Sequence, residues 1–262
     1  MNILFLTKSK QYTNKLLDDL VSVGDEVTVI CKDYSSFRDS EMEKYCLLNN
    51  VSFYDNGDLY KLLTLGELPH YDFAISNTYG KLIKKDLIEY LNGNIINLHG
   101  AILPDYKGAF AYNWALYNLE SVYGVTAHFV NEKFDEGDII EVSRFPINPE
   151  EITVSELELK CQETAYELTK RILEKVRKHE LVSSQPQDTK GHYYSRQDFE
   201  NLKKIERDDA DDVVERKYHA CWCPPYDGTY IEVNGDKYFL VKNGDWKKLT
   251  DRSVLGKSRV GG

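Results

Sequence analysis

The chain has 262 residues, a formal net charge of −10 at pH 7, 42% apolar residues and 29% charged residues. This length can bury a sizeable core, and the composition excludes wholesale disorder and a fibrous repeat. The acidic balance disfavours partners that are bound through many phosphates, such as a long duplex or a tRNA, because phosphate binding needs clustered cations.

Cysteine usage and the apolar runs predict a cytoplasmic protein. The five cysteines are an odd number, and one residue separates Cys221 from Cys223 where a metal or redox pair has two, which favours reduced thiols. The start of the chain has no basic leader, and no apolar run approaches the length of a membrane span. We therefore expect no metal and no membrane partner.

The first part of the chain alternates short apolar runs with helical patterns. Helical spacing predicts helices at 12–23 and 79–91, and apolar runs predict strands at 3–6, 27–31, 73–76 and 94–98. Strands and helices in this alternation form a buried parallel sheet with helices on both faces. The predicted fold class is α/β with a Rossmann-like, mostly parallel sheet. The loop at 7–10 lacks the glycines that cradle a dinucleotide, so NAD is not expected.

A long helix closes this first part. Thr153 and Glu156 have the spacing of a capping box, and an apolar stripe with helical spacing follows them. Pro186 stands in the polar segment after the helix, where we expect a domain boundary. The predicted domains are a catalytic domain at 1–185 and a C-terminal extension at 186–262.

The C-terminal extension is predicted to hold a small helix and a β-hairpin. The acidic segment 206–212 precedes a short helical pattern that reaches about Tyr218. Residues 229–241 alternate as strands do, across the two-residue turn Asn234-Gly235. The tail after Thr250 carries no prediction.

Two polar residues, Asn97 and His99, stand at the end of the strand predicted at 94–98, and a third, Asp135, comes later in the chain. Side chains alternate along a strand, so Asn97 and His99 point the same way, with α-carbons roughly 6.6 Å apart. Parallel sheets bind their ligands at the carboxyl ends of the strands, where both residues lie. Asp135 belongs to a return segment, 124–140, which we expect to bring it beside His99.

An amide, an imidazole and a carboxylate suffice for acyl transfer to an amine. Asn97 can donate to the oxyanion, and His99 can take the surplus proton because imidazole titrates near roughly pH 6.5. Asp135 would orient the imidazole and stabilise its charged form. Taken singly, the same residues have ordinary interpretations as turn formers or as a hydrogen-bonded loop histidine.

The order of the surrounding motifs favours the chemical interpretation. The motifs are Asn-x-His-Gly from 97, Leu-Pro-x-Tyr-x-Gly from 103, Trp114, Gly-Val-Thr-x-His from 124 and Asp-x-Gly-x-x-Ile from 135. This series resembles the folate-dependent formyltransferases, strongly over roughly 75–140 and weakly over the first strand and helix. The resemblance implies that Asn97, His99 and Asp135 are catalytic and that 10-formyltetrahydrofolate is the formyl donor.

The same resemblance places further residues around the two substrates. It implies that the pterin pocket is lined by Tyr79, Lys81, Leu82 and Ile83, with the loop that contains Asp138 closing over it. The alternative is that Leu82 and Ile83 only pack a helix onto the sheet. Lys107 and Gly108 are implied to flank the acceptor amine.

Two segments of the extension resemble those of sugar N-formyltransferases. These are Tyr-Tyr-Ser-Arg at 193–196 and Trp-Cys-Pro-Pro-Tyr at 222–226. The resemblance implies that they hold the nucleotide through Tyr194, Arg196, Trp222 and Tyr226. Arg196 could pair with a diphosphate, and Trp222 or Tyr226 could stack on a base. The alternative for 222–226 is a rigid turn before the hairpin. Cys223 and Ala109-Phe110 depart from the family pattern, so the resemblance says less about the shape of the sugar pocket.

The resemblance implies a dTDP-linked amino-dideoxy sugar as acceptor, with dTDP-4-amino-4,6-dideoxyglucose as the first candidate, for surface polysaccharide synthesis such as that of O-antigen and lipopolysaccharide. It also implies a homodimer formed through the hairpin region. Alternatives are a dTDP-3-amino sugar and a methionyl-tRNA formyltransferase-like activity, which the charge disfavours. A catalytically idle nucleotide-sugar binder is the alternative from another class.

Overall fold

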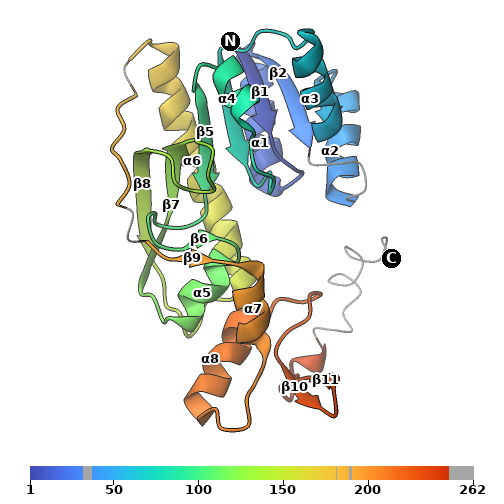
Figure 1. Cartoon of the computed structure of the whole chain (residues 1–262), viewed down its shortest axis with the longest axis vertical. Helices are drawn as coiled ribbons and strands as arrows, with labels where there is room; N and C mark the ends of the chain where they lie inside the picture. Colours follow the sequence, from blue (N-terminus) through green and yellow to red (C-terminus); the bar gives the residue numbers. More distant parts are fainter. Residues whose placement is uncertain (32–36, 181, 189–190, 248–262) are drawn as a thin grey trace. The chain divides into compact units, whose positions relative to one another are not determined.

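The structure is a computed structural model that describes residues 1–31, 37–180, 182–188 and 191–247 (Figure 1). The chain divides into two compact units, each made of three segments. The first unit comprises Met1–Pro104, Gly124–Ser143 and Cys161–Lys190, and the second comprises Asp105–Tyr123, Arg144–Lys160 and Gly191–Gly262. The division of the chain at residue 185 stays a prediction.

A seven-stranded sheet organises the first unit. In spatial order its strands are β3 (Ser52–Asp55), β2 (Glu26–Cys31), β1 (Asn2–Leu6), β4 (Phe73–Asn77), β5 (Ile95–His99), β7 (Val122–Phe129) and β8 (Ile139–Pro146). The strands from β3 to β5 pair in parallel, whereas β7 runs antiparallel to β5. The α/β class with a mostly parallel sheet is confirmed.

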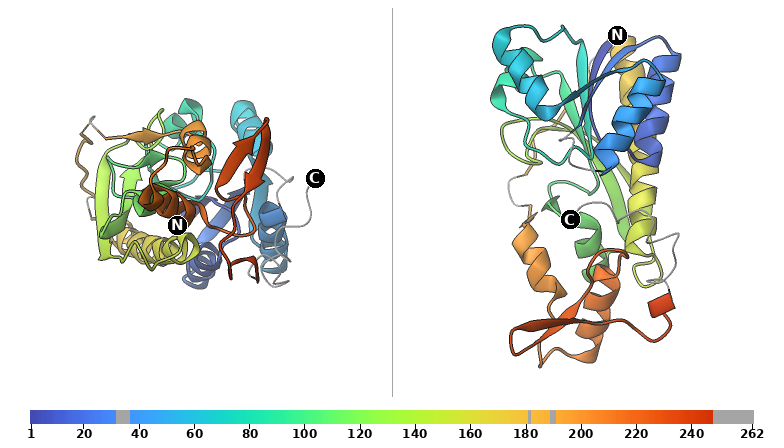
Figure 2. Two further views of the ribbon diagram at one scale, coloured as in Figure 1. Left: turned by 90° about the horizontal axis from the view of Figure 1, so that it is seen from below. Right: turned by 90° about the vertical axis from the view of Figure 1, so that its right-hand side faces the viewer.

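Helices cover both faces of this sheet, as the apolar runs of its strands require (Figure 2). They are α1 (Gln11–Ser22), α2 (Phe37–Leu48), α3 (Asn56–Leu65), α4 (Lys85–Tyr90) and α6 (Val154–Arg177). Leu59 of α3 and Leu87 of α4 join Leu4 and Leu6 of β1 in one core cluster. The rings of Tyr12 and Tyr166 join α1 to α6, with centroids 5.9 Å apart. No helix within the described ranges combines the length and the apolar character that crossing a bilayer needs.

The long helix begins where the capping box predicts. Thr153 and Glu156 exchange hydrogen bonds, with Thr153 N donating to the Glu156 carboxylate over 2.9 Å and Glu156 N donating to the Thr153 hydroxyl over 3.3 Å. These bonds from Thr153 hold the pKa of the Glu156 carboxyl below its ordinary value. The predicted start of α6 is confirmed.

The helix predicted at 79–91 is wrong over its first half. Only Lys85–Tyr90 is helical, and a loop joins it to β4. Thr78 and Gly80 have φ angles of 62° and 73°, in the left-handed region that a right-handed helix cannot contain. Ile83 and Leu87 are both buried in the core, and their spacing of four residues imitates a helix although Ile83 lies in the loop.

The second unit contains small elements from distant parts of the chain. They are β6 (Lys107–Gly108), α5 (Ala111–Tyr117), β9 (Tyr193–Tyr194), α7 (Arg196–Lys203), α8 (Asp211–Cys221) and the hairpin of β10 (Tyr230–Val233) and β11 (Asp236–Phe239). Asn234 and Gly235 have positive φ angles of 54° and 87°, as the two central residues of a type I′ turn require. The short helix and the hairpin predicted from the sequence are confirmed.

Candidate active site

A row of three polar side chains crosses the sheet of the first unit. Asn97 of β5 pairs in register with Ser76 of β4 on one side and with His128 of β7 on the other. Residues in register on neighbouring strands point to the same face, so the three side chains meet. His99 lies two residues beyond Asn97 on β5, and therefore shares that face.

Hydrogen bonds fix the orientation of the Asn97 amide. His128 donates from Nδ1 to the carbonyl oxygen of Phe129 over 2.8 Å, so Nε2 of the neutral ring is an acceptor. This acceptor lies 3.1 Å from Asn97 Nδ2, and the Ser76 hydroxyl donates to Asn97 Oδ1 over 2.8 Å. Among the described residues no second acceptor is found for Nδ2, so one of its hydrogens can serve a ligand. Asn97 is half-buried, so it does not face a closed interior.

The structure brings Asp135 to His99. Asp135 Oδ1 lies 3.4 Å from His99 Nδ1, and both side chains are 10% exposed. The separation exceeds an ideal hydrogen bond, and such contacts often shorten when substrate binds. An Nδ1 that faces a carboxylate leaves Nε2 as the basic nitrogen of His99. The same Oδ1 is 3.8 Å from His128 Nε2, so the carboxylate lies between two imidazoles.

The turn that carries Asp135 packs closely on the end of β7. Asp135 has a φ of 55°, and the Phe129 N–H donates to the carbonyl of Asp138 over 2.9 Å. A Cβ on Gly137 would lie 1.7 Å from the carbonyl oxygen of Phe129. The spacing Asp-x-Gly thus has a steric reason, because only glycine allows this approach.

A buried threonine braces the loop that leaves His99. The Thr126 hydroxyl donates to the carbonyl of Ala101 over 2.7 Å and accepts from Leu103 N over 3.0 Å. Thr126 is 0% exposed and pairs in register with His99. The threonine of Gly-Val-Thr therefore holds the chain just after the imidazole.

The residues predicted to bind folate follow the carboxyl end of β4, next to β5 in the sheet (Figure 1). Tyr79 and Ile83 are 3% and 5% exposed and belong to the core cluster, whereas Leu82 is 42% exposed. Lys81 is half-buried, and Asp138 is exposed. The Oγ1 atom of Thr78 is buried and has no hydrogen-bond partner among the described residues.

Four of the predicted acceptor residues gather around the pairing of β6 with β9 in the second unit. Lys107 and Gly108 pair in register with Tyr193 and Tyr194. Lys107 is 5% exposed. A Cβ on Gly108 would lie 2.4 Å from the carbonyl oxygen of Tyr194, so the glycine allows the two strands to approach.

The Tyr194 ring stacks on Trp114 at 4.4 Å and lies 5.6 Å from the Tyr106 ring. Arg196 begins α7, with its guanidinium 5.9 Å from the centre of the Phe110 ring. Together, these contacts put Tyr194 and Arg196 beside aromatic rings of the segment that follows Lys107.

Ser195 has a structural role that the sequence did not reveal. It is the N-cap of α7, and its hydroxyl accepts from Asp198 N over 3.1 Å while Asp198 Oδ2 accepts from Ser195 N over 2.8 Å. Hydrogen bonds from the Ser195 side chain and backbone lower the pKa of the Asp198 carboxyl. The motif thereby sets where α7 begins.

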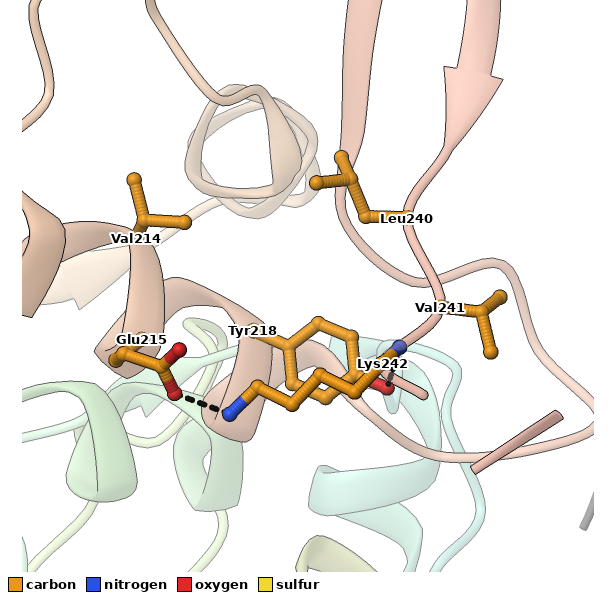
Figure 3. A pocket seen from close by; sticks show the side chains of 6 residues that line it. All are labelled: Val214, Glu215, Tyr218, Leu240, Val241 and Lys242. Atoms are coloured by element: carbon orange, nitrogen blue, oxygen red, sulfur yellow. Dashed lines mark hydrogen bonds and ion pairs between the residues drawn. The ribbon is translucent and has the colours of Figure 1, made fainter. Parts of the chain in front are cut away.

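The structure does not bring Trp222 and Tyr226 into this aromatic group. Trp222 stacks on Tyr218 of α8 at 5.3 Å, and Tyr226 is 63% exposed. A cavity of about 330 Å³ beside α8 is lined by Val214, Glu215, Tyr218, Leu240, Val241 and Lys242. Figure 3 shows the ion pair between Lys242 and Glu215 across it. None of the predicted site residues lines this cavity.

Two contributors to the first-unit site were not assigned roles from the sequence. Ser76 could have been suspected as the hydroxyl in an otherwise apolar run at 73–76, and His128 as the last residue of the Gly-Val-Thr-x-His motif. Gln187 also contacts the turn of Asp135, through its side-chain amide. Among the described residues, no three His, Cys, Asp or Glu side chains gather as metal ligands would.

Residues 59–173 match the protein family described as formyl transferase. A methionyl-tRNA formyltransferase of Thermodesulfovibrio yellowstonii is 35% identical over 116 residues, which are 44% of this chain and 37% of that protein. The chain spans about half the length, or less, of the curated relatives it matches.

Solved structures of N-formyltransferases have a similar fold. A 4-N formyltransferase from Francisella tularensis has a TM-score of 0.76 and 19% identity, covering 92% of this chain and 97% of that one. An N-formyltransferase from Helicobacter canadensis, in complex with folinic acid and dTDP-3-aminofucose, has a TM-score of 0.72 and 22% identity, covering 90% and 86%. At these identities the likeness concerns the fold.

Proposed function

We propose that this chain, whose residues 59–173 match the formyl transferase family, transfers a formyl group from 10-formyltetrahydrofolate to the amine of a dTDP-linked amino-dideoxy sugar. The first candidate acceptor is dTDP-4-amino-4,6-dideoxyglucose. The observation that carries the proposal is the convergence of Asn97, His99 and Asp135 at one end of the sheet.

Each of the three side chains has a defined task in this reaction. The folate would supply the formyl carbon, and the sugar would supply the attacking nitrogen. The remaining N–H of Asn97 donates to the oxygen as it gains negative charge. His99 Nε2 takes the proton that the nitrogen loses and returns it to the departing N10 of the folate. Asp135 stabilises the imidazolium through Nδ1.

The folate assignment is supported at the carboxyl end of β4. Thr78 Oγ1 is a buried polar atom without a partner in the described ranges, directly before Tyr79 of the predicted pterin segment. Buried polar groups are nearly always hydrogen-bonded, so a polar ring edge fits this position. The residue is also held at a φ of 62°, and strain of this kind clusters at ligand sites.

The nucleotide-sugar assignment is supported by the second unit. Lys107 is only 5% exposed as a residue, and a lysine in such a position suits an anionic ligand because a buried cation is costly without an anion. Arg196 is exposed beside the aromatic rings and suits a diphosphate. The fold shared with the Francisella tularensis and Helicobacter canadensis enzymes agrees with a nucleotide-sugar acceptor.

Two alternatives share the same chemistry. A dTDP-3-amino sugar is favoured by the ligand of the Helicobacter canadensis structure. A methionyl-tRNA acceptor is favoured by the names of the curated relatives, while the net charge of −10 counts against it. The product of a sugar formyltransferase would serve the synthesis of O-antigen or other surface polysaccharide.

A homodimer is part of the proposal. The hairpin forms a sheet of only two strands, and Ile231, Val233, Tyr238 and Phe239 are between 39% and 54% exposed. A two-stranded hairpin is marginally stable by itself, and exposed apolar groups of this kind mark contact surfaces. Light scattering of the purified chain would determine its mass in solution.

The function is tested by supplying the folate donor with dTDP- and UDP-linked 3-amino and 4-amino sugars, and with initiator methionyl-tRNA, and by detecting product by mass spectrometry. Asn97→Ala should lower kcat roughly 100- to 1,000-fold, because an oxyanion donor is worth about 2.7–4 kcal/mol. His99→Asn and Asp135→Asn should lower it as well. If all three variants formed product at the parental rate, the assigned roles would be wrong. If no acceptor were formylated, an idle binder would be the better description.

A further inference from the structure

The side chain of Gln187 reaches back to the turn that carries Asp135. Its Nε2 lies 3.0 Å from the carbonyl oxygen of Asp135 and 2.6 Å from that of Gly137. Carbonyl oxygens only accept hydrogen bonds, so both contacts require the amide nitrogen and not the amide oxygen. The orientation of the Gln187 amide is therefore settled by its partners.

The backbone next to Gln187 holds the same turn at its other end. Gln185 and Ile139 form an isolated antiparallel bridge, in which each N–H donates to the other carbonyl over 2.8 Å. With the two bonds from Gln187, four hydrogen bonds tie the chain at 185–187 to the turn at 135–139. The turn is thus secured from a segment about 50 residues later in the chain.

Asp135 needs such support because of its backbone conformation. Its φ of 55° lies in the left-handed region, which a residue with a side chain keeps only when its surroundings hold it there. Relaxation to a negative φ would redirect the carboxylate, which now lies 3.4 Å from His99 Nδ1. Of the two carbonyls that Gln187 binds, one belongs to Asp135 itself and the other to Gly137, two residues later on the turn.

We propose that Gln187 is a positioning residue: its amide nitrogen clamps the carbonyls of Asp135 and Gly137, and thereby keeps the Asp135 carboxylate aimed at His99. This role rests on the proposed function of the same site. Gln187 touches neither imidazole in the described structure and acts through the turn alone.

The sharpest variant is Gln187→Glu, which keeps the shape of the side chain but turns an oxygen toward the two carbonyls. The matched control is Gln185→Glu, the same change two residues away at an exposed side chain whose backbone alone makes the bridge. We expect kcat/KM to fall roughly 10- to 100-fold in Gln187→Glu, with the KM for the acceptor little changed, and to stay parental in the control.

Two readouts do not depend on formyl transfer. Amide hydrogen exchange at 136–139 should be faster in Gln187→Glu while that of β1 and β4 is unchanged. Nitrogen-15 NMR of the His99 ring should lose the Nδ1-protonated pattern, because the Asp135 carboxylate would no longer face that nitrogen. Another titratable group that faces Asp135 is His128. Gln187→Met, which lacks both donor and repelling oxygen, replaces Gln187→Glu in every measurement if the latter fails to fold.

The outcomes separate the two proposals. If exchange, ring pattern and kcat in the Gln187 variant all matched those of Gln185→Glu, the positioning role would be refuted. If the wild-type chain formylated none of the acceptors while exchange and ring pattern changed as expected, the proposed function would fail and the positioning of Asp135 would stand.

Discussion

Gly137→Ala is the substitution whose effect can be worked out most fully from the structure. The added Cβ would lie 1.7 Å from the carbonyl oxygen and 2.7 Å from the carbonyl carbon of Phe129, whereas separations under 3.0 Å are essentially never found. Both obstacles are backbone atoms, so the turn itself must move away from β7, by roughly 1.3 Å along the shorter contact. Asp135 lies two residues away on the same turn.

A displacement of about 1 Å at a catalytic group can cost roughly 100-fold in rate, which is about 2.7 kcal/mol of barrier. Overpacking of this kind also lowers the free energy of unfolding by about 1–3 kcal/mol. We therefore expect kcat/KM for formyl transfer to fall roughly 100-fold, while the chain stays folded at 25 °C.

The assay compares Gly137→Ala with Gly228→Ala, where a Cβ would meet only ordinary contacts at 3.7 and 3.9 Å. Steady-state kinetics give kcat/KM, and urea denaturation gives the free energy of unfolding. Parental kinetics in Gly137→Ala, with parental stability, would refute the argument that this approach of the turn to β7 positions Asp135.

Three further substitutions or treatments test other parts of the structure. Ser76→Ala removes the donor to Asn97 Oδ1. It should lower kcat up to roughly tenfold with little change in KM, since a hydrogen bond is worth about 0.5–1.5 kcal/mol. An unchanged kcat would show that His128 alone orients the Asn97 amide. The Asp25 side chain is 5% exposed and pairs with both the N-terminal ammonium and Arg177. Asp25→Asn should lower the free energy of unfolding, measured by urea denaturation, by about 1.5–3 kcal/mol. An unchanged free energy of unfolding would mean that solvent already screens these ion pairs. Burial raises the pKa of the Cys46 and Cys221 thiols to about 12, so iodoacetamide at pH 8 should alkylate the half-buried Cys223 first; peptide mapping that found Cys46 or Cys221 modified earlier would contradict this.

The sequence predicted best where one local signal decides the structure. The apolar runs marked β1, β2, β4 and β5, because a strand covered on both faces is mostly apolar. Thr153 with Glu156 marked the start of α6, and Asn234-Gly235 marked the hairpin. In each case, residues close together in the sequence determine where the element forms.

The sequence predicted least where the cause lies far away in the chain. The sequence of loop 78–84 has helical spacing because Ile83 is buried in the core although it lies in a loop. No local sequence pattern predicts the left-handed φ of Thr78. The pairing of β6 with β9 joins residues more than 80 positions apart. Spacing placed Asn97 and His99 on one face, but the partners that orient Asn97, Ser76 and His128, come from neighbouring strands whose register no motif encodes.

The interleaving of the two units limits how this protein could be re-engineered. In the second unit, Asn113 of α5 donates to the carbonyl of Ala220 in α8 over 2.7 Å, although the two residues are 107 positions apart. A chimera that exchanged only the C-terminal third of the chain would set a foreign α8 against a native α5. A graft of the second unit therefore calls for transplanting 105–123 together with the segment that contains α8.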